Sequence, residues 1–374
     1  MYPFIFRHII MYPFLFRQII TRSCKMATRT NATTGMVGSY NLNSSPQRAL
    51  IESSMPFIKN AVENLNISRG NWPVLIADFG SSHGKNSMDA IKSIINYAKE
   101  LKKTDRQFLS VHIDLPTNDW TAFFDYSNEQ HEKKEKNFFS LATGQSFYKQ
   151  CLPPNCLTIG YSSGSIHWLS QIPCNIINHC ISTFAEGDEL QKFKNQARDD
   201  YRNFLANRSR EFIQGGILVL VMNSFNDKGI TGTESIYHLL YKCAELTLST
   251  NELLNYTLPV YIRSNGECVD KELFDQNSFE LIDSKISAVD FEFYAQLKNN
   301  IMGLEEFSKK QTEFIRCATD SVLRGALQST GKRSKEDIDQ LSNKFWDLYK
   351  EHVQQKPHDF DIKCYQTYVV LKKR

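Results

Sequence analysis

The fold is decided by the stretch Val74-Leu75-Ile76-Ala77-Asp78-Phe79-Gly80-Ser81-Ser82-His83-Gly84-Lys85-Asn86. It opens with an almost wholly apolar run, which is typical of a strand buried on both faces. Glycines and serines follow at once and indicate a tight turn. From about residue 88 to 101, apolar side chains recur at the spacing of one helix face. A buried strand that leads through a glycine-containing turn into an amphipathic helix is the repeating unit of a parallel α/β sheet.

The same alternation continues along the chain. Apolar runs at 108–113, 156–161 and 217–222 predict further buried strands, and a polar helix with an apolar face is expected at about 188–213. Residues 365–371 read as an apolar closing strand. Because near-continuous apolar strands alternate with helices, we predict an α/β fold whose mainly parallel sheet is covered by helices on both faces.

The chain is expected to divide into a leader, a core domain, a mainly helical cap and a C-terminal return to the sheet, at residues 1–35, 36–231, 232–340 and 341–374. Within the cap, helical patterns at 234–248 and 295–329 flank polar connections, and 291–294 is a candidate short strand. Ligands of open α/β sheets bind beyond the carboxyl ends of the strands. A cap placed there would close a pocket.

The leader has an unusual sequence. MYPFIFRHII at 1–10 recurs almost unchanged at 11–20, and no acidic residue precedes Glu52. Arginines interrupt its apolar runs, so it fits neither a membrane span nor an ordinary signal peptide. A disordered or spurious extension is expected, with Met26 or Met36 as alternative starts. A mitochondrial targeting segment is the alternative interpretation.

Composition excludes several classes of protein. The 374 residues carry a net charge of only +3 without a basic stripe or an aromatic–basic motif, so we expect no nucleic-acid partner. Hydrophobic residues make up 41%, enough for a substantial core. The nine cysteines are scattered without a Cys-x-x-Cys pair. They therefore predict no zinc site and indicate reduced thiols in the cytoplasm.

Two strand ends carry candidate ligand-binding residues. The turn that contains Asp78 and Gly80 would let the backbone approach a ligand closely, although many α/β folds have such a turn. Asp114 follows the next strand and could accept hydrogen bonds from both hydroxyls of a ribose, or could merely begin the turn at 115–119. The separation of Gly80 from Asp114 is longer than in dinucleotide-binding motifs, which disfavours an NAD enzyme.

The third strand runs into Tyr161-Ser162-Ser163-Gly164-Ser165-Ile166-His167-Trp168-Leu169-Ser170-Gln171-Ile172-Pro173. Small polar residues here precede a His-Trp pair at the pocket side of a strand end. A Gly-x-Ser-x-Gly motif is absent, and the Ser and His have no placed acid, so a hydrolase triad is not indicated. The residue types alone predict only a pocket wall.

Taken together, these segments resemble the SABATH family of small-molecule carboxyl methyltransferases, which is named for plant enzymes acting on salicylate, benzoate and theobromine precursors. The resemblance covers roughly residues 36–374. Segments that match in the same order are 39–47, 76–86, 114–119, 144–148, 162–173, 200–208 and 211–220. Any one of them is a weak signal, whereas seven in order are a specific one.

The resemblance implies a class I methyltransferase (Rossmann-like) sheet with a helical cap, S-adenosyl-L-methionine as cofactor, and a small carboxylic acid as substrate. The cofactor would be bound by Tyr40, Asp78, Gly80, Ser81, Asn86, Asp114, Leu115, Ser146, Phe147 and Ser163. Gln47 and Trp168 would act as catalytic residues that bind the substrate carboxylate, with Gly164 and His167 completing the substrate site. The resemblance also implies that the chain could form a homodimer.

The implied reaction needs little acid–base chemistry. A carboxylate is already a nucleophile at neutral pH, so the task is to place its oxygen in line with the methyl group, at about 3 Å. The amide of Gln47 and the indole N–H of Trp168 are neutral donors suited to this. Two alternatives keep the same fold: N-methylation of a small heterocycle, and a catalytically silent relative that only binds small molecules. Retention of both donors favours oxygen.

Gly164 is a departure from the family pattern. Plant members usually have Tyr at this position, and loss of the ring should enlarge the acyl pocket. We therefore expect a longer aliphatic or isoprenoid acid rather than salicylate. The competing interpretation is that the glycine serves a backbone conformation with positive φ.

The metal site found in some family members also departs from the pattern. The connection that would supply an Asn is shortened and leaves Asn178, and the segment 254–259 lacks the matching Asp and Asn. We predict that no metal is needed.

Overall fold

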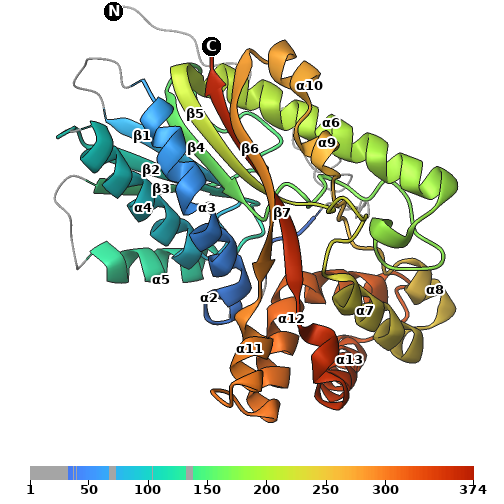
Figure 1. Cartoon of the computed structure of the whole chain (residues 1–374). Coiled ribbons are helices and arrows are strands. Elements are labelled where there is room, and N and C mark those ends of the chain that lie inside the picture. The colour runs from blue at the N-terminus through green and yellow to red at the C-terminus, as the bar shows by residue number, and fades with distance from the viewer. Residues whose placement is uncertain (1–32, 37, 39, 67–72, 103, 132–137) are drawn as a thin grey trace, which may run out of the picture. The chain divides into compact units, whose positions relative to one another are not determined.

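The structure is a computed structural model that describes residues 33–374 apart from 37, 39, 67–72, 103 and 132–137 (Figure 1). The predicted leader lies almost entirely outside these residues. Within them, seven strands form a sheet in the order β3-β2-β1-β4-β5-β7-β6. The strands are β1 Val74–Phe79, β2 Phe108–Asp114, β3 Phe138–Gly144, β4 Leu157–Ser163, β5 Phe212–Asn223, β6 Phe279–Asp290 and β7 Lys363–Lys373.

The sheet is mainly parallel. Strands β3, β2, β1, β4 and β5 are parallel to their neighbours, whereas β7 runs antiparallel to both β5 and β6. The predicted α/β fold is therefore confirmed. The buried runs that predicted β1, β2, β4 and β5 are the central strands, and the apolar segment predicted at the C-terminus is β7.

Helices cover both faces of the sheet (Figure 1). Alternate residues of a strand point to opposite faces. Ile76 packs with α3 (Ser45–Asn64) and α4 (Lys85–Lys102), while Ala77 faces the apolar cluster of α6 (Gly187–Glu211). The two-sided burial explains why the strands read as continuous apolar runs. Shorter helices are α2 Tyr40–Asn43, α5 Trp120–His131, α9 Asn265–Cys268 and α10 Lys271–Gln276.

The cap has an apolar core of its own. Its helices are α7 Glu234–Thr247, α8 Thr250–Leu254, α11 Glu292–Lys298, α12 Leu304–Gln328 and α13 Lys335–Gln355. Figure 1 shows them gathered at one end of the sheet. Asp320 joins α12 to α13, since it accepts hydrogen bonds from Ser342 at 2.7 Å and from the indole of Trp346 at 2.6 Å. The helical character expected for this region is observed.

The expected cap boundaries need correction. Strand β6 lies within the range 232–340 but belongs to the sheet, so the cap is interrupted by a core strand. The strand expected at 291–294 is wrong, because these residues enter α11. β6 is an edge strand with one neighbour and mostly half-exposed or exposed side chains. It therefore lacks the continuous apolar run that identified the central strands. Helix α13 also crosses the expected boundary at 340.

A membrane-crossing helix is absent from the described part of the chain, where every helix is too short or too polar for that role.

Gly232 marks the place where the chain enters the cap. It adopts φ of +79°, and a Cβ added to it would lie 1.8 Å from the carbonyl oxygen of Lys363. Next to it, the backbone N–H of Tyr365 donates to the carbonyl of Thr231 at 3.0 Å. The glycine thus allows the start of the cap to lie directly against the start of β7.

Gly232→Ala should therefore be strongly destabilising. The variant combines an unfavourable φ, which costs roughly 1–2 kcal/mol, with a backbone clash, so we expect a loss of about 3 kcal/mol or more in the free energy of unfolding. Gly331→Ala is the matched control, since Gly331 has φ of +64° but no described atom within 4 Å of its added Cβ. Gly331→Ala should lose only the roughly 1–2 kcal/mol that the unfavourable φ costs. Urea unfolding measures both, and equal losses would contradict the packing argument.

Candidate active site

The turn after β1 is shaped so that two loops can meet. Gly80 adopts φ of +105°, and a Cβ on it would lie 2.1 Å from Oγ of Ser165 in the loop after β4. The hydroxyl of Ser81 is buried beside it without a hydrogen-bond partner. Glycine therefore allows the close approach of the loops, and a bound ligand would satisfy the unpartnered hydroxyl.

Asp114, at the end of β2, is oriented by the backbone around it. Its two carboxylate oxygens accept the backbone N–H groups of Ser82 and Leu115, each at 2.7 Å. A carboxylate has about four acceptor positions, so lone pairs remain for the two hydroxyls of a ribose. Asn86 donates to the carbonyl of Ser44 at 3.1 Å and thereby connects α4 to the segment that enters α3.

Two carboxyl groups, the buried Asp78 and the half-buried Asp114, determine the electrostatics of this end of the sheet. Burial raises the pKa of Asp78 to about 7; a hydrogen bond with Ser87 opposes the rise and the charge of Asp114 adds to it. Burial also raises the pKa of Asp114, against its backbone hydrogen bonds. A neighbouring cation favours the ionised form of a carboxyl group. The region therefore suits a ligand that brings positive charge, as the sulfonium and ammonium groups of S-adenosyl-L-methionine do.

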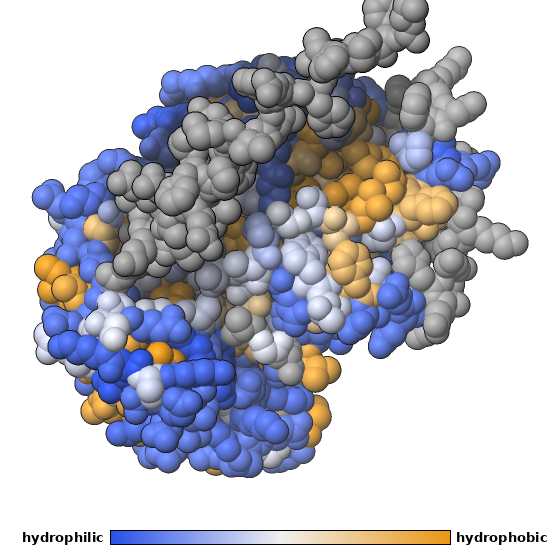
Figure 2. Space-filling model, turned by 180° about the vertical axis from the view of Figure 1, so that it is seen from behind, coloured by the Kyte–Doolittle hydropathy of each residue, from blue (hydrophilic) through white to orange (hydrophobic). Residues whose placement is uncertain are grey.

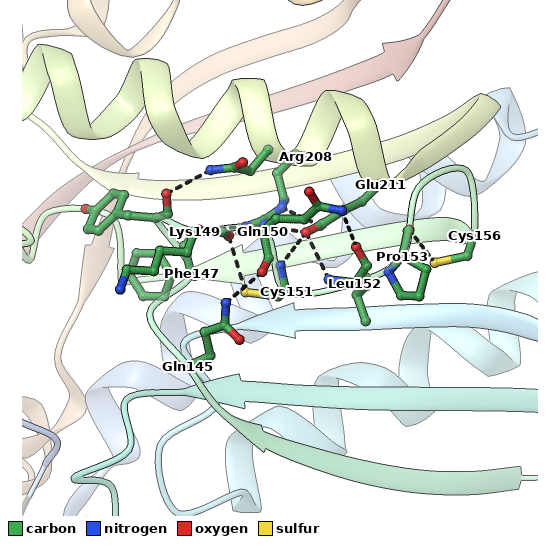
Figure 3. Close-up of polar contacts among 12 residues, drawn as sticks. Gln145, Phe147, Lys149, Gln150, Cys151, Leu152, Pro153, Cys156, Arg208 and Glu211 are labelled. Carbon is green, nitrogen blue, oxygen red and sulfur yellow. Dashed lines mark hydrogen bonds and ion pairs between the residues drawn. The ribbon is translucent and has the colours of Figure 1, made fainter.

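The loop that carries Ser146 and Phe147 is held by a fully buried ion pair (Figure 3). Arg208 and Glu211 of α6 contact each other at 2.7 Å and are both completely buried. Arg208 also donates to the carbonyl of Phe147 at 2.7 Å, and Glu211 accepts the backbone N–H of Cys151 at 2.6 Å. The pair thus fixes the backbone of the loop at both ends. This gives a structural role to Arg208 and Glu211, for which the sequence alone predicts none.

The loop after β4 is held just as firmly. The guanidinium of Arg263, which is buried, donates to the carbonyls of Ile166 at 2.8 Å and Ala197 at 2.7 Å. The hydroxyl of Tyr148 contacts the carbonyls of Ile166 and Trp168, at 3.2 and 2.7 Å. Side chains therefore fix two carbonyls of this loop, those of Ile166 and Trp168, and Arg263 also connects the loop to Ala197 of α6. This positions the side chains that the loop presents.

A cavity of about 780 Å³, counted to its open mouth, lies beside this loop. The structure brings together around it the following predicted site residues: Tyr40, Gln47, Gly164, His167 and Trp168. The other predicted cofactor residues lie at the ends of β1, β2 and β4, in the first turn of α4 (Asn86), and in the loop at 145–152, where Phe147 is 3.8 Å from an added Cβ of Gly80. Both groups meet at the loop after β4, so a cofactor and a substrate could be adjacent.

Much of the cavity wall comes from residues that sequence analysis missed. Outside the cap they are Met36, Pro46, Leu50, Asn223 and Cys364, and from the cap they are Thr233, Ile236, Tyr237, Leu258, Val260, Phe291, Phe314, Ile315, Ala318 and Thr319. On α12, the lining residues occur at the i, i+1, i+4, i+5 spacing of one helix face. That periodicity predicts a buried face but does not say which of its residues border a cavity.

The polar groups of the cavity are uncharged. Burial, and next the charge of Arg263, lower the pKa of His167 to about 3, so its imidazole is neutral. Oε1 of Gln47 and Nδ1 of His167 are buried without a hydrogen-bond partner. Lysine and arginine are absent from the described lining residues. The cavity therefore offers neutral hydrogen-bonding groups to an anion.

Gly164 combines the two roles proposed for it. It lines the cavity, and its φ of +60° lies in the left-handed region that favours glycine. An added Cβ would lie 3.4 Å from Cδ1 of Leu50. Any side chain here would be strained whatever the space, so cavity size alone does not explain the glycine.

The structure adds little on metals. Among the described residues no three His, Cys, Asp or Glu side chains are grouped so that they could bind an ion. Independence from metal stays a prediction.

The class of protein follows from the fold and from a family comparison. The sequence profile of the family described as SAM dependent carboxyl methyltransferase matches residues 29–374. The chain belongs to this family, and the class predicted from the SABATH-like motifs is confirmed. It is an enzyme that uses S-adenosyl-L-methionine to methylate a carboxyl group.

Individual relatives agree with this class. A probable S-adenosylmethionine-dependent methyltransferase of Arabidopsis thaliana is 27% identical over 90% of this chain and 95% of its own length. Salicylate carboxymethyltransferase of Clarkia breweri is 29% identical over 66% of this chain and 72% of its own. The solved structure of loganic acid methyltransferase with SAH has a TM-score of 0.72 and 22% identity, covering 91% and 98% of the two chains. This last likeness confirms the class I methyltransferase fold.

The buried ion pair at 208 and 211 yields a prediction about stability. Glu211→Gln would leave Arg208 as an uncompensated buried charge, and we expect the free energy of unfolding to fall by about 3–5 kcal/mol. Asp199→Asn is the matched control on the same helix, because Asp199 pairs with Arg202 at the same spacing but both side chains are exposed. It should cost less than about 1 kcal/mol. Similar losses in the free energy of unfolding of the two variants, measured by denaturant unfolding, would show that the buried ion pair does not stabilise the loop.

Proposed function

We propose that the chain transfers the methyl group of S-adenosyl-L-methionine to a carboxylate oxygen of a small organic acid that Gln47 and Trp168 bind. The observation that supports this most strongly is the cavity. It is lined by both neutral donors, and the described lining residues include no cation. A buried Arg or Lys would form a strong ion pair with the carboxylate and reduce its nucleophilicity. Gln47 and Trp168 can orient the anion without that cost.

The residues at the strand ends fit the cofactor. Gly80 lets the loop after β4 approach the turn after β1, Ser81 offers an unpartnered hydroxyl, and Asp114 offers a fixed carboxylate for the ribose. Tyr40, Ser81 and Asn86 would line the methionine part, Leu115, Ser146 and Phe147 would hold the adenine end, and Ser163 would touch the cofactor. When bound, S-adenosyl-L-methionine supplies an activated methyl group. The chain's own residues then have to position the acid and exclude water.

Positioning is the main catalytic contribution of the chain. Because Arg263 and Tyr148 fix the carbonyls of the loop after β4, the indole of Trp168 has a defined place. Gln47 approaches from α3, on the other side of the cavity. The apolar cap residues remove water around the reacting carboxylate, which strengthens its interaction with the two donors.

The state of His167 favours oxygen over nitrogen as acceptor. Methylation of a heterocyclic N–H requires a base to remove the proton. His167 is the titratable imidazole on the described cavity wall, and its pKa of about 3 makes it a weak base. A carboxylate needs no such base, so esterification matches the groups present.

The proposal includes a cytoplasmic reaction. The eight cysteines among the described residues are all free thiols, the state that a reducing compartment maintains. The mitochondrial alternative rests on the leader, which lies outside the described residues. A homodimer, implied by the resemblance, stays a prediction.

The proposal is tested by supplying methyl-labelled S-adenosyl-L-methionine with a panel of aliphatic, isoprenoid and aromatic acids. We expect label in a base-labile methyl ester. Trp168→Phe removes only the indole N–H and should lower kcat/KM about 10–100-fold, because a hydrogen bond to a charged group contributes roughly 1.5–3 kcal/mol. Gln47→Glu should be more harmful, since it opposes one carboxylate with another.

Binding of S-adenosylhomocysteine, measured by calorimetry, is the control for both variants and should change little. A base-stable product would indicate N-methylation instead. Cofactor binding without product from any acid would indicate a silent relative.

A further inference from the structure

The cavity contains more unpartnered polar groups than a carboxylate requires. Three of its lining residues have a buried polar side-chain atom without a hydrogen-bond partner: Oε1 of Gln47, Nδ1 of His167 and Oδ1 of Asn223. The proposed function assigns Gln47, with Trp168, to the carboxylate. The proposed function gives the orphan atoms of His167 and Asn223 no hydrogen-bond partner.

The position of Asn223 is rigid. It is the last residue of β5 and is paired with Gln366 of β7. On the other side of β5, the backbone N–H of Gly164 donates to the carbonyl of Val221 at 2.9 Å. Strands therefore fix the backbone on both sides. Asn223 and Gly164 both line the cavity, so the side chain at the end of β5 belongs to its wall.

Two threonine hydroxyls of the cavity wall differ from the amide of Asn223 because they already have hydrogen-bond partners. Thr319 donates to the carbonyl of Ile315 on its own helix at 2.9 Å, and Thr233 shares a hydrogen bond with Thr231 at 2.9 Å. A buried polar group without a partner costs about 1–3 kcal/mol, and a ligand that supplies the partner regains that free energy. The amide of Asn223 and the imidazole of His167 are thus available for a ligand in a way that the threonines are not.

The ligand group that would supply these missing hydrogen bonds must be neutral. His167 is uncharged, and none of the described lining residues is Lys, Arg, Asp or Glu. A second carboxylate or an ammonium group would be buried there without a counter-charge. A hydroxyl suits the pair because it can donate one hydrogen bond and accept another. The remaining walls are apolar, with Leu50, Ile236, Leu258 and Phe314 among them.

We propose that the substrate is a largely apolar monocarboxylic acid carrying a second, neutral hydroxyl group that Asn223 and His167 bind. This inference rests on the proposed function, because it assumes that the carboxylate occupies Gln47 and Trp168. It refines the expectation of a long aliphatic or isoprenoid acid: the apolar body fits that expectation, and the hydroxyl is an addition. Asn223 then determines specificity.

The test uses octanoic acid, its monohydroxylated isomers and octanedioic acid as probes. For each we would measure kcat/KM, and also the dissociation constant from the complex with S-adenosylhomocysteine. At least one hydroxylated isomer should exceed octanoic acid about tenfold or more in both quantities, the size expected when a buried polar pair gains its partner. Octanedioic acid should bind more weakly than octanoic acid, because its second charge has no counterpart.

Two variants test whether Asn223 causes the preference for a hydroxylated acid. Asn223→Leu keeps the volume but removes the amide, and should abolish the preference for the hydroxylated isomer; Asn223→Ala serves where the leucine variant fails to fold. Thr319→Val is the matched control and should retain the ratio between the two acids, because its hydroxyl is already bonded within α12.

Each outcome decides between the two proposals. Equal binding of octanoic acid and all its hydroxylated isomers, or a preference that survives loss of the Asn223 amide, would overturn this inference while leaving ester formation intact. Absence of any ester, with the binding preference still present, would overturn the proposed reaction and not the hydroxyl site. Absence of both would overturn the two together.

Discussion

The structure depends most on the hydrogen bonds that fix the loop after β4. Arg263 and Tyr148 bind the backbone carbonyls of that loop from behind, at 2.7–3.2 Å. The same loop borders the two regions proposed for the ligands. Ser165 approaches the glycine turn proposed for the cofactor, and Trp168 lines the cavity proposed for the substrate. Since methyl transfer requires two molecules to be placed within about 3 Å of each other, one rigid wall shared by both regions is the feature that the reaction needs most.

Three buried charged side chains fix backbone segments, and none of them lies on the described wall of the cavity proposed for the acid. Arg208 and Glu211 fix one loop, and Arg263 fixes another, all three being buried. A buried cation is costly unless it is well hydrogen-bonded, and each arginine satisfies that need with main-chain carbonyls. The arginines therefore stay outside the described wall of the cavity. The groups left facing the substrate are neutral, which suits a nucleophile that must remain reactive.

The central part of this architecture could be predicted from sequence, and the reason is physical. Strands buried on both faces produce apolar runs, so β1, β2, β4 and β5 were recognisable, as were the turn at Gly80 and the carboxyl group of Asp114. Edge strand β6 is half exposed and carries no such pattern, so it was missed. The cavity wall was missed for another reason: Asn223 and Phe314 are 91 residues apart in the numbering, and only the fold brings them to one cavity. For Gly164 the sequence leaves two interpretations open, a larger pocket and a positive φ, and only the backbone of the fold shows that the positive φ is present.

The proposed reaction requires that neutral donors from α3 and from the loop after β4 hold a carboxylate against the cofactor. A crystal structure of the chain with S-adenosylhomocysteine and an acid that it methylates would test this most directly. We predict that the carboxylate lies within hydrogen-bond distance of the Gln47 amide and the Trp168 indole nitrogen, with one oxygen directed at the sulfur. A carboxylate bound instead by a lysine or arginine, or directed away from the sulfur, would contradict the account.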